Sequence, residues 1–156
     1  MKIEDYIFNS GIELITYNFK SNNIKAMCSN NLIAISPKIT DTKEKICILA
    51  EELAHTIINV GDISNNPKEE LKARGLAYNS LIGLNGIVTS YKCGCVTRYD
   101  MAEFLEVTES FLDEAINWYK SKYGVSVMYE DYEIRFIPNL SVTKNIRSEM
   151  KCYQKF

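Results

Sequence analysis

Two glutamates and the only histidine of this 156-residue chain lie within one short segment, Glu51-Glu52-Leu53-Ala54-His55. On a helix, residues four apart project to nearly the same side, so Glu51 and His55 would be neighbours with Glu52 beside them. This spacing is that of the zinc-hydrolase motif H-E-x-x-H, with glutamate in place of the first histidine. It predicts Glu51 and His55 as metal ligands and Glu52 as the general base.

A catalytic zinc ion needs three protein ligands and one open position for water, so a third ligand must come from elsewhere. Glu70 begins the next predicted helix and shares a face with Ala73 and Ala77, the side expected to contact the motif helix. Glu69 and Asp62 are the alternatives, because spacing alone demands none of the three. We predict Glu70 as the third ligand and Zn²⁺ as the metal, with Mn²⁺ as the other candidate because carboxylate ligands favour harder metals.

Capping signals and apolar spacing place the motif well inside a helix of about residues 42–60. Asp41 predicts an N-cap with Glu44 as its capping-box partner, and Gly61 predicts the C-terminal cap. The expected buried stripe has helical spacing and consists of Ile46, Leu49, Ala50, Leu53 and Ile57.

The elements on either side of this helix predict an α+β fold. A short helix over residues 3–9 and β-prone stretches at 12–17, 24–28 and 32–36 come first, with Asn30-Asn31 as a hairpin turn. The expected helices that follow cover residues 67 to 81, opened by Asn66 and Pro67, and then about 87–91, 100–105 and 109–122. Thr97 and Asp100 predict a capping box before the helix at 100–105. Strand-like sequence at 125–137 completes a fold with a small N-terminal β-sheet, a mainly helical part and a C-terminal strand pair. We expect one domain over 1–138 and a polar tail over 139–156.

Composition and charge indicate a cytoplasmic protein. The net charge is −2 and hydrophobic residues make up 46% of the chain, so no overall charge attracts nucleic acid or anionic lipid. The sequence contains no apolar run long enough to span a membrane and no signal-peptide pattern. Five scattered cysteines do not indicate a disulfide framework, and we expect reduced thiols.

Residues 98–122 have the spacing of a helix-turn-helix unit. Small and apolar residues stand at the expected core positions, and Glu106 occupies a turn position that favours glycine. Between residues 97 and 122, however, three basic side chains face six acidic ones. That charge would repel phosphate, so the unit is predicted to pack or to dock a protein and not to bind nucleic acid.

The five motif residues alone also fit an ordinary amphipathic helix with a packed histidine, but a wider stretch is more specific. It resembles the ImmA/IrrE family of metallopeptidases, most of all the short versions found in prophages and mobile elements of Gram-positive bacteria. Those proteins carry an "LAEELGH" helix, which is present here with Ala54 in place of glycine. The resemblance runs through residues 45–55, 60–63, 72–78, 91–95 and 101–108.

This resemblance implies a zincin-like fold and an intracellular peptidase that cleaves a phage-type helix-turn-helix repressor. Carried over by position, Glu51 and His55 take ligand sites and Glu52 takes the role of the base. The family's third ligand is a glutamate directly before the alanine of the next helix, where this chain has Lys72, and Glu70 is the nearest glutamate. The other reading is a catalytically inactive relative that binds a repressor or regulator without cleaving it.

Overall fold

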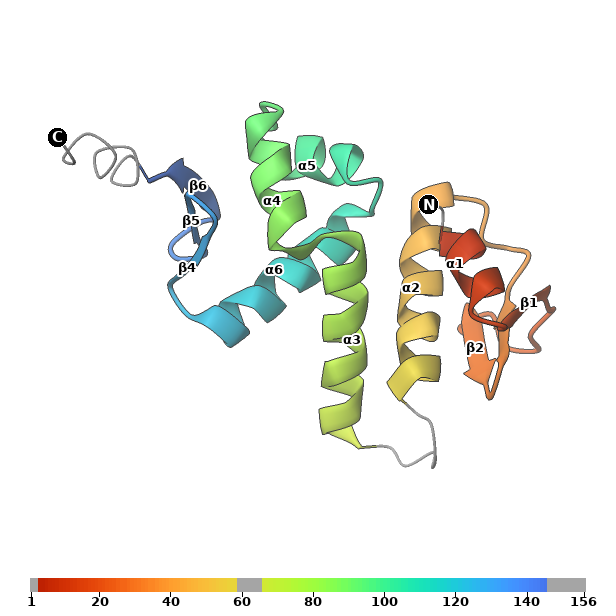
Figure 1. The fold of residues 1–156 in the computed structure, drawn as a ribbon. Helices are drawn as coiled ribbons and strands as arrows, with labels where there is room; N and C mark the ends of the chain where they lie inside the picture. Colours follow the sequence, from red (N-terminus) through yellow and green to blue (C-terminus); the bar gives the residue numbers. More distant parts are fainter. Residues whose placement is uncertain (1–2, 59–65, 146–156) are drawn as a thin grey trace, which may run out of the picture. The chain divides into compact units, whose positions relative to one another are not determined.

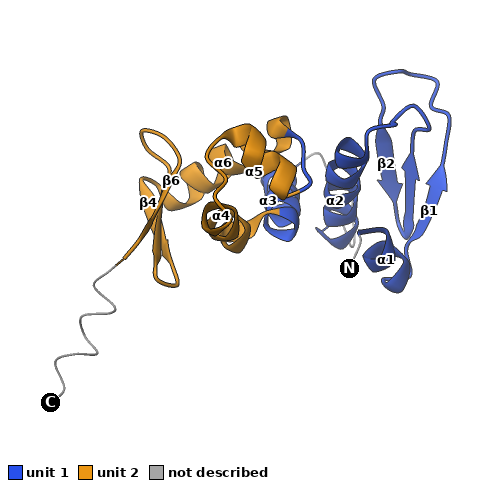
Figure 2. Cartoon of the chain, turned by 90° about the horizontal axis from the view of Figure 1, so that it is seen from above, with its two compact units in different colours: residues 1–81, 106–108 blue, residues 82–105, 109–156 orange. Residues whose placement is uncertain are grey.

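The computed structural model of the chain describes residues 3–58 and 66–145 (Figure 1). The chain divides into two compact units (Figure 2). Unit 1 comprises residues 1–81 and 106–108, and unit 2 comprises residues 82–105 and 109–156. The predicted cap Gly61 and the alternative ligand Asp62 lie outside the described residues. All the other candidate ligands belong to unit 1.

The described part of unit 1 combines helices with a small sheet. Its elements are α1 (Ile3–Asn9), β1 (Glu13–Thr16), β2 (Ala26–Ser29), β3 (Leu32–Ile35), α2 (Thr42–Ile58) and α3 (Pro67–Leu81). Helix α2 lies between the sheet and α3 (Figure 1). The motif helix is therefore the central element of the unit.

The sheet has strand order β1-β3-β2 and supports α2 with an apolar face. Strands β2 and β3 form the predicted antiparallel hairpin, and Asn30 takes the positive φ of 51° at its turn. Strand β1 joins β3 in parallel. Ile33 and Ile35 of β3 form a core with Leu49 and Leu53 of α2, because alternate strand residues and every third or fourth helix residue share a face.

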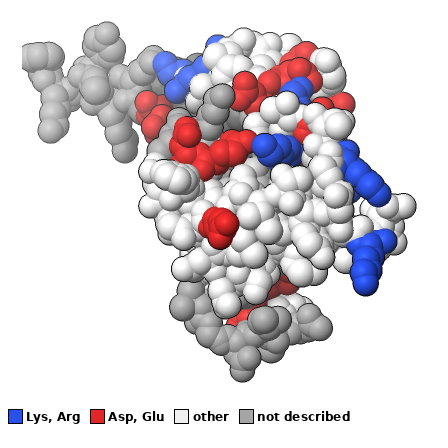
Figure 3. All heavy atoms as spheres, turned by 90° about the vertical axis from the view of Figure 1, so that its right-hand side faces the viewer, with Lys and Arg blue, Asp and Glu red and all other residues white. Residues whose placement is uncertain are grey.

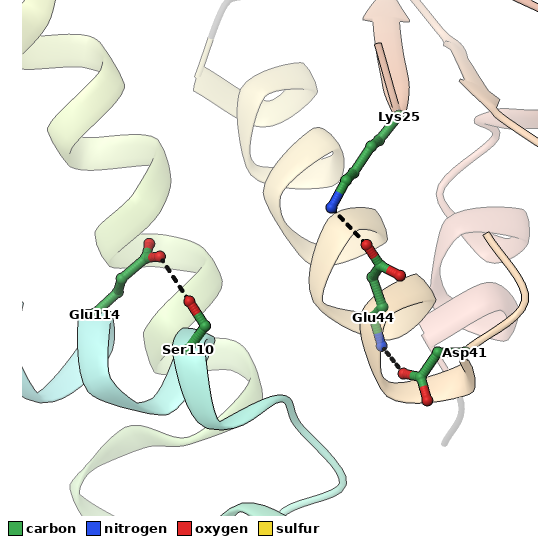
Figure 4. Close-up of polar contacts among 5 residues, drawn as sticks. All are labelled: Lys25, Asp41, Glu44, Ser110 and Glu114. Atoms are coloured by element: carbon green, nitrogen blue, oxygen red, sulfur yellow. Dashed lines mark hydrogen bonds and ion pairs between the residues drawn. The ribbon is translucent and has the colours of Figure 1, made fainter. Parts of the chain in front are cut away.

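The start of α2 is fixed by polar contacts. The Asp41 carboxylate accepts a hydrogen bond from the backbone N–H of Glu44 at 2.7 Å, which confirms the predicted N-cap (Figure 4). The Glu44 side chain in turn pairs with Lys25 at 2.5 Å. Most of the predicted stripe is buried or partly buried, but Ile57 is 47% exposed, so the prediction was wrong for the last turn of the helix.

Helix α3 begins as its sequence predicts and packs closely on α2. The Asn66 side chain accepts a hydrogen bond from the backbone N–H of Lys68 at 3.0 Å, and Pro67 follows it as the first helical residue. Ala73 and Ala77 are buried, as expected for small residues at a close helix contact. Leu76, in contrast, is 38% exposed.

The described part of unit 2 continues the helical region and ends in a second sheet. Its elements are α4 (Gly83–Lys92), α5 (Arg98–Phe104), α6 (Glu109–Tyr123), β4 (Ser126–Tyr129), β5 (Tyr132–Arg135) and β6 (Ser141–Lys144). Helix α5 begins with a capping box between Thr97 and Asp100, as the sequence indicates. The turn before α6 places Glu106 at φ 55°, the conformation that favours glycine.

The C-terminal sheet extends further than predicted. Strands β4 and β5 form the expected antiparallel pair, but β6 adds to the other edge of β5, giving the order β4-β5-β6. Residues 141–144 therefore do not belong to a tail, and residues 146–156 lie outside the description. Strand β6 was missed because Val142 is its only apolar side chain, and Val142 becomes buried only by pairing opposite Ile134.

These elements confirm the α+β class, with a small N-terminal sheet, a helical middle and C-terminal strands. Within the described residues, every helix is too short or too polar to cross a membrane.

Candidate functional site

Two of the predicted metal ligands meet between α2 and α3. His55 Nε2 of α2 lies 3.3 Å from Glu70 Oε2 of α3. The His55 side chain is 24% exposed and the Glu70 side chain 45%, so the pair is partly covered but open to solvent on one side. The small residue Ala73, one turn after Glu70, lets the two helices approach. The predicted face of α3 is thereby confirmed, and the sequence-based choice of Glu70 brings it next to His55.

Arg74 is a neighbour that sequence reasoning did not select. Its Nε lies 2.7 Å from Glu70 Oε1, the carboxylate oxygen that does not face His55. The hydrogen bond from Arg74 to Glu70 raises the pKa of the guanidinium. The signal for this pair was present in the sequence, because Glu70 and Arg74 are four residues apart on a predicted helix. The positive charge beside a candidate metal ligand is the unexpected feature of the site.

Glu52, the predicted base, projects toward the sheet and is partly buried. Its carboxylate accepts hydrogen bonds from the thiol and the backbone N–H of Cys28 on β2, and His55 and Glu70 act on it electrostatically. Burial raises the pKa of Glu52, while the Cys28 hydrogen bonds and the nearby His55 oppose that rise. Glu52 therefore lies within the electrostatic reach of the His55–Glu70 pair.

Cys28 is the second neighbour that sequence reasoning did not identify as part of the site. Burial and the Glu52 carboxylate raise the pKa of its thiol to about 11, so the thiol stays protonated and serves as a hydrogen-bond donor. No local pattern could have found this contact. It depends on the hairpin register, which places Cys28 opposite Ile33 on the strand beside α2.

The remaining candidates make other interactions. Glu51 acts electrostatically on Arg74 and on the buried Cys47 thiol. Glu69 donates its backbone N–H to the Asn66 carbonyl at 2.9 Å, in the first turn of α3. Lys72 is exposed on α3 and brings an ammonium group to the position where the resemblance expects a ligand. The contact that the structure shows between two candidate ligands is thus the His55–Glu70 pair, and Glu51 lies within electrostatic reach of its neighbour Arg74.

The chemistry and spacing of the close pair suit a metal ion. Two ligands bound tetrahedrally to Zn²⁺ at ~2.0–2.2 Å lie about 3.4 Å apart, close to the 3.3 Å between His55 Nε2 and Glu70 Oε2. Imidazole and carboxylate are ligands that both Zn²⁺ and Mn²⁺ accept. Within residues 3–58 and 66–145, no group of three or more His, Cys, Asp or Glu side chains is arranged to hold a metal ion. The described residues supply a fitting donor pair, and the third ligand stays a prediction.

The helix-turn-helix-like region shows the buried core that its spacing predicts. Its small and apolar positions, at Ala102, Val107, Leu112 and Ala115, are buried. On its exposed surface, Arg98 forms an ion pair with Asp113 at 2.6 Å. Figure 3 shows a different side of the molecule, the one on which α1 and the strands of unit 1 lie in Figure 1, and there too Lys and Arg side chains lie among Asp and Glu. Docking of a protein partner to this region stays a prediction.

Comparison with known proteins gives one match. A family model, the IrrE N-terminal-like domain (Peptidase_M78), matches residues 9–117, which include both helices of the site and all its candidate residues. The searches of curated proteins and of solved structures found no match.

Proposed function

Because the chain belongs to the IrrE N-terminal-like family of metallopeptidases, we propose that it is a metal-dependent endopeptidase encoded by a prophage or a related mobile element. Its substrate would be a cytoplasmic helix-turn-helix repressor, whose cleavage releases expression of that element. The family membership supports hydrolysis and a metal cofactor. The repressor and the cytoplasmic location are expectations from the resemblance described above.

The observation that carries this proposal is the position of Glu52 beside the donor pair. Peptide hydrolysis requires a base that removes a proton from water and returns it to the leaving nitrogen. A base is most effective when its pKa lies closer to the working pH, and burial shifts the pKa of Glu52 in that direction. The two hydrogen bonds from Cys28 orient the carboxylate and favour its ionised form, which is the form that accepts a proton.

His55 and Glu70 would hold the metal, with Glu51 as the proposed third ligand. When bound, the metal would polarise the substrate carbonyl and lower the pKa of water. The chain's own contribution is to orient these groups: α2 presents Glu52 and His55 from adjacent turns, and α3 presents Glu70 across the helix contact.

Cleavage of the repressor encoded beside this gene tests the proposal. Purified chain, loaded with Zn²⁺ or Mn²⁺, is incubated with that repressor, and the products are identified by mass spectrometry. We expect one main cut in the wild type and none with Glu52→Gln. Glu109→Gln, which changes an exposed glutamate of α6, is the matched control and should cleave normally. Equal cleavage by Glu52→Gln and wild type would contradict the role of Glu52, and the absence of cleavage by the wild type would contradict the peptidase proposal.

A second function is favoured by the positive charges on α3. Arg74 binds the carboxylate of Glu70, and Lys72 stands at the family's third ligand position. A protein with this arrangement could bind the repressor without cutting it. In that case the repressor would bind with equal affinity in the presence and absence of a chelator, and Glu52→Gln would bind as well as the wild type.

A further inference from the structure

Arg74 and a metal ion would compete for the same carboxylate. Glu70 uses Oε1 to contact Arg74 Nε at 2.7 Å and Oε2 to contact His55 Nε2 at 3.3 Å. One oxygen of Glu70 is therefore already engaged by a cation, and a divalent ion that bound Glu70 would meet the positive charge of Arg74 beside it. Metal binding to His55 and Glu70 would have to act against the contact between Glu70 and Arg74.

We propose that Arg74 is a built-in counter-ion of this site, which neutralises Glu70 in the metal-free protein and lowers the affinity of the site for a divalent cation. This inference rests on the assignment of His55 and Glu70 as metal donors. Arg74 lies outside the Glu-Glu-x-x-His motif, which assigns no role to it. Arg74 would act on the metal through Glu70 and through its own charge, without touching the substrate.

The exposed position of Arg74 allows its guanidinium to move away from Glu70 when a metal binds. Glu70 and Arg74 lie one turn apart on α3, and the Arg74 side chain is 51% exposed. An ion pair this exposed contributes little to folding, so the guanidinium can turn into water without disturbing the helix. The Arg74–Glu70 ion pair is therefore expected to affect metal affinity more than the free energy of unfolding.

The carboxylates near Arg74 determine how strongly its charge lowers the affinity of the site for a divalent cation. Glu70 and Glu51 both act on the guanidinium electrostatically. Arg74 cancels part of the negative potential that those carboxylates would offer to a metal. One positive charge at ~6 Å from a divalent ion in a water-like medium changes its affinity by roughly tenfold. We therefore expect about tenfold tighter binding when that charge is removed.

Titration of the purified full-length chain with Zn²⁺ and with Mn²⁺, against a chromophoric chelator, tests this inference. The variants are Arg74→Met, which removes the charge but keeps most of the side-chain volume, and Arg74→Lys, which keeps the charge. Arg98→Met is the matched control, because Arg98 forms a similarly short ion pair with Asp113 in unit 2. Thermal unfolding confirms that all the variants are folded.

The expected result is roughly tenfold tighter metal binding by Arg74→Met, with Arg74→Lys and Arg98→Met close to the wild type. The gain in metal affinity must disappear in the double variant that carries both Arg74→Met and His55→Ala. Equal or weaker binding by Arg74→Met overturns the inference, as does a gain that persists without His55. Because no cleavage is measured, a protein that binds metal in this way but leaves the repressor intact contradicts only the proposed function.

Discussion

Cys28 on β2 donates both its thiol and its backbone N–H to the carboxylate of Glu52 on α2. This contact links the small sheet of unit 1 to the helix that carries the candidate site. It holds a carboxylate in a partly buried position where burial raises its pKa, and it keeps the thiol protonated. The first two predictions follow from these opposing effects.

Glu52→Gln should stabilise the protein at neutral pH. An acid whose pKa is raised in the folded state binds its proton more tightly when folded. Its contribution to stability is therefore greatest below the ordinary glutamate pKa and is lost as the pH rises through the raised value. Glutamine carries no charge and avoids that loss, so we expect a gain of roughly 0.5–2 kcal/mol at pH 7, the usual size of a single stabilising substitution.

Urea denaturation at several pH values measures this effect. The difference between Glu52→Gln and wild type should shrink toward zero at about pH 3, where glutamate is almost fully protonated in both states. Glu109→Gln provides the exposed control, with little change at any pH. A variant less stable than the wild type at pH 7 would show that the ionised Glu52 is well accommodated in the fold.

The thiol of Cys28 should resist alkylation. A thiol with a pKa of about 11 is almost fully protonated at pH 8. Since only the thiolate reacts, Cys28 should react with iodoacetamide roughly two orders of magnitude more slowly than an ordinary exposed cysteine. Cys93 is the exposed internal reference. Mass spectrometry of tryptic peptides gives the two rates, and Glu52→Gln should accelerate labelling of Cys28 alone. Labelling of both cysteines at one rate would contradict the Cys28–Glu52 contact.

Glu106→Gly should stabilise the fold. Glu106 has φ 55°, where a β-carbon costs roughly 1 kcal/mol that glycine does not incur. We expect a higher melting temperature by a few degrees, reduced in part by the greater chain entropy of unfolded glycine. Gly124→Ala is the reciprocal control, since Gly124 has φ 76° and should lose stability by a similar amount. A lower melting temperature for Glu106→Gly would mean that contacts of the Glu106 side chain outweigh its backbone strain.

Local signals were sufficient to predict the elements that carry the site. The Asp41 cap, the Asn66 cap and the Thr97 capping box each depend on residues three or fewer positions apart, and each formed as expected. Strand β6 was missed because its polar sequence becomes a strand only beside β5. Sequence could thus predict where helices begin more reliably than which edge a polar strand joins.

The site itself was only partly predictable. Helical spacing correctly placed Glu70 on the face of α3 that meets His55, because both positions follow from periodicity. The role of Cys28 depends on tertiary packing between a hairpin and a helix, which no spacing along the chain encodes. Arg74 was visible as an i, i+4 partner of Glu70, but a surface ion pair and the counter-ion of a metal ligand have the same sequence pattern.

His55 and Glu70 are proposed to bind one metal ion, and anomalous diffraction from a crystal of the Zn²⁺-loaded protein tests this binding most directly. We predict a single strong peak within ~2.0–2.2 Å of both His55 Nε2 and a carboxylate oxygen of Glu70, with the Arg74 guanidinium displaced from Glu70. A peak at other residues, or a loaded crystal without a peak between α2 and α3, would contradict the account.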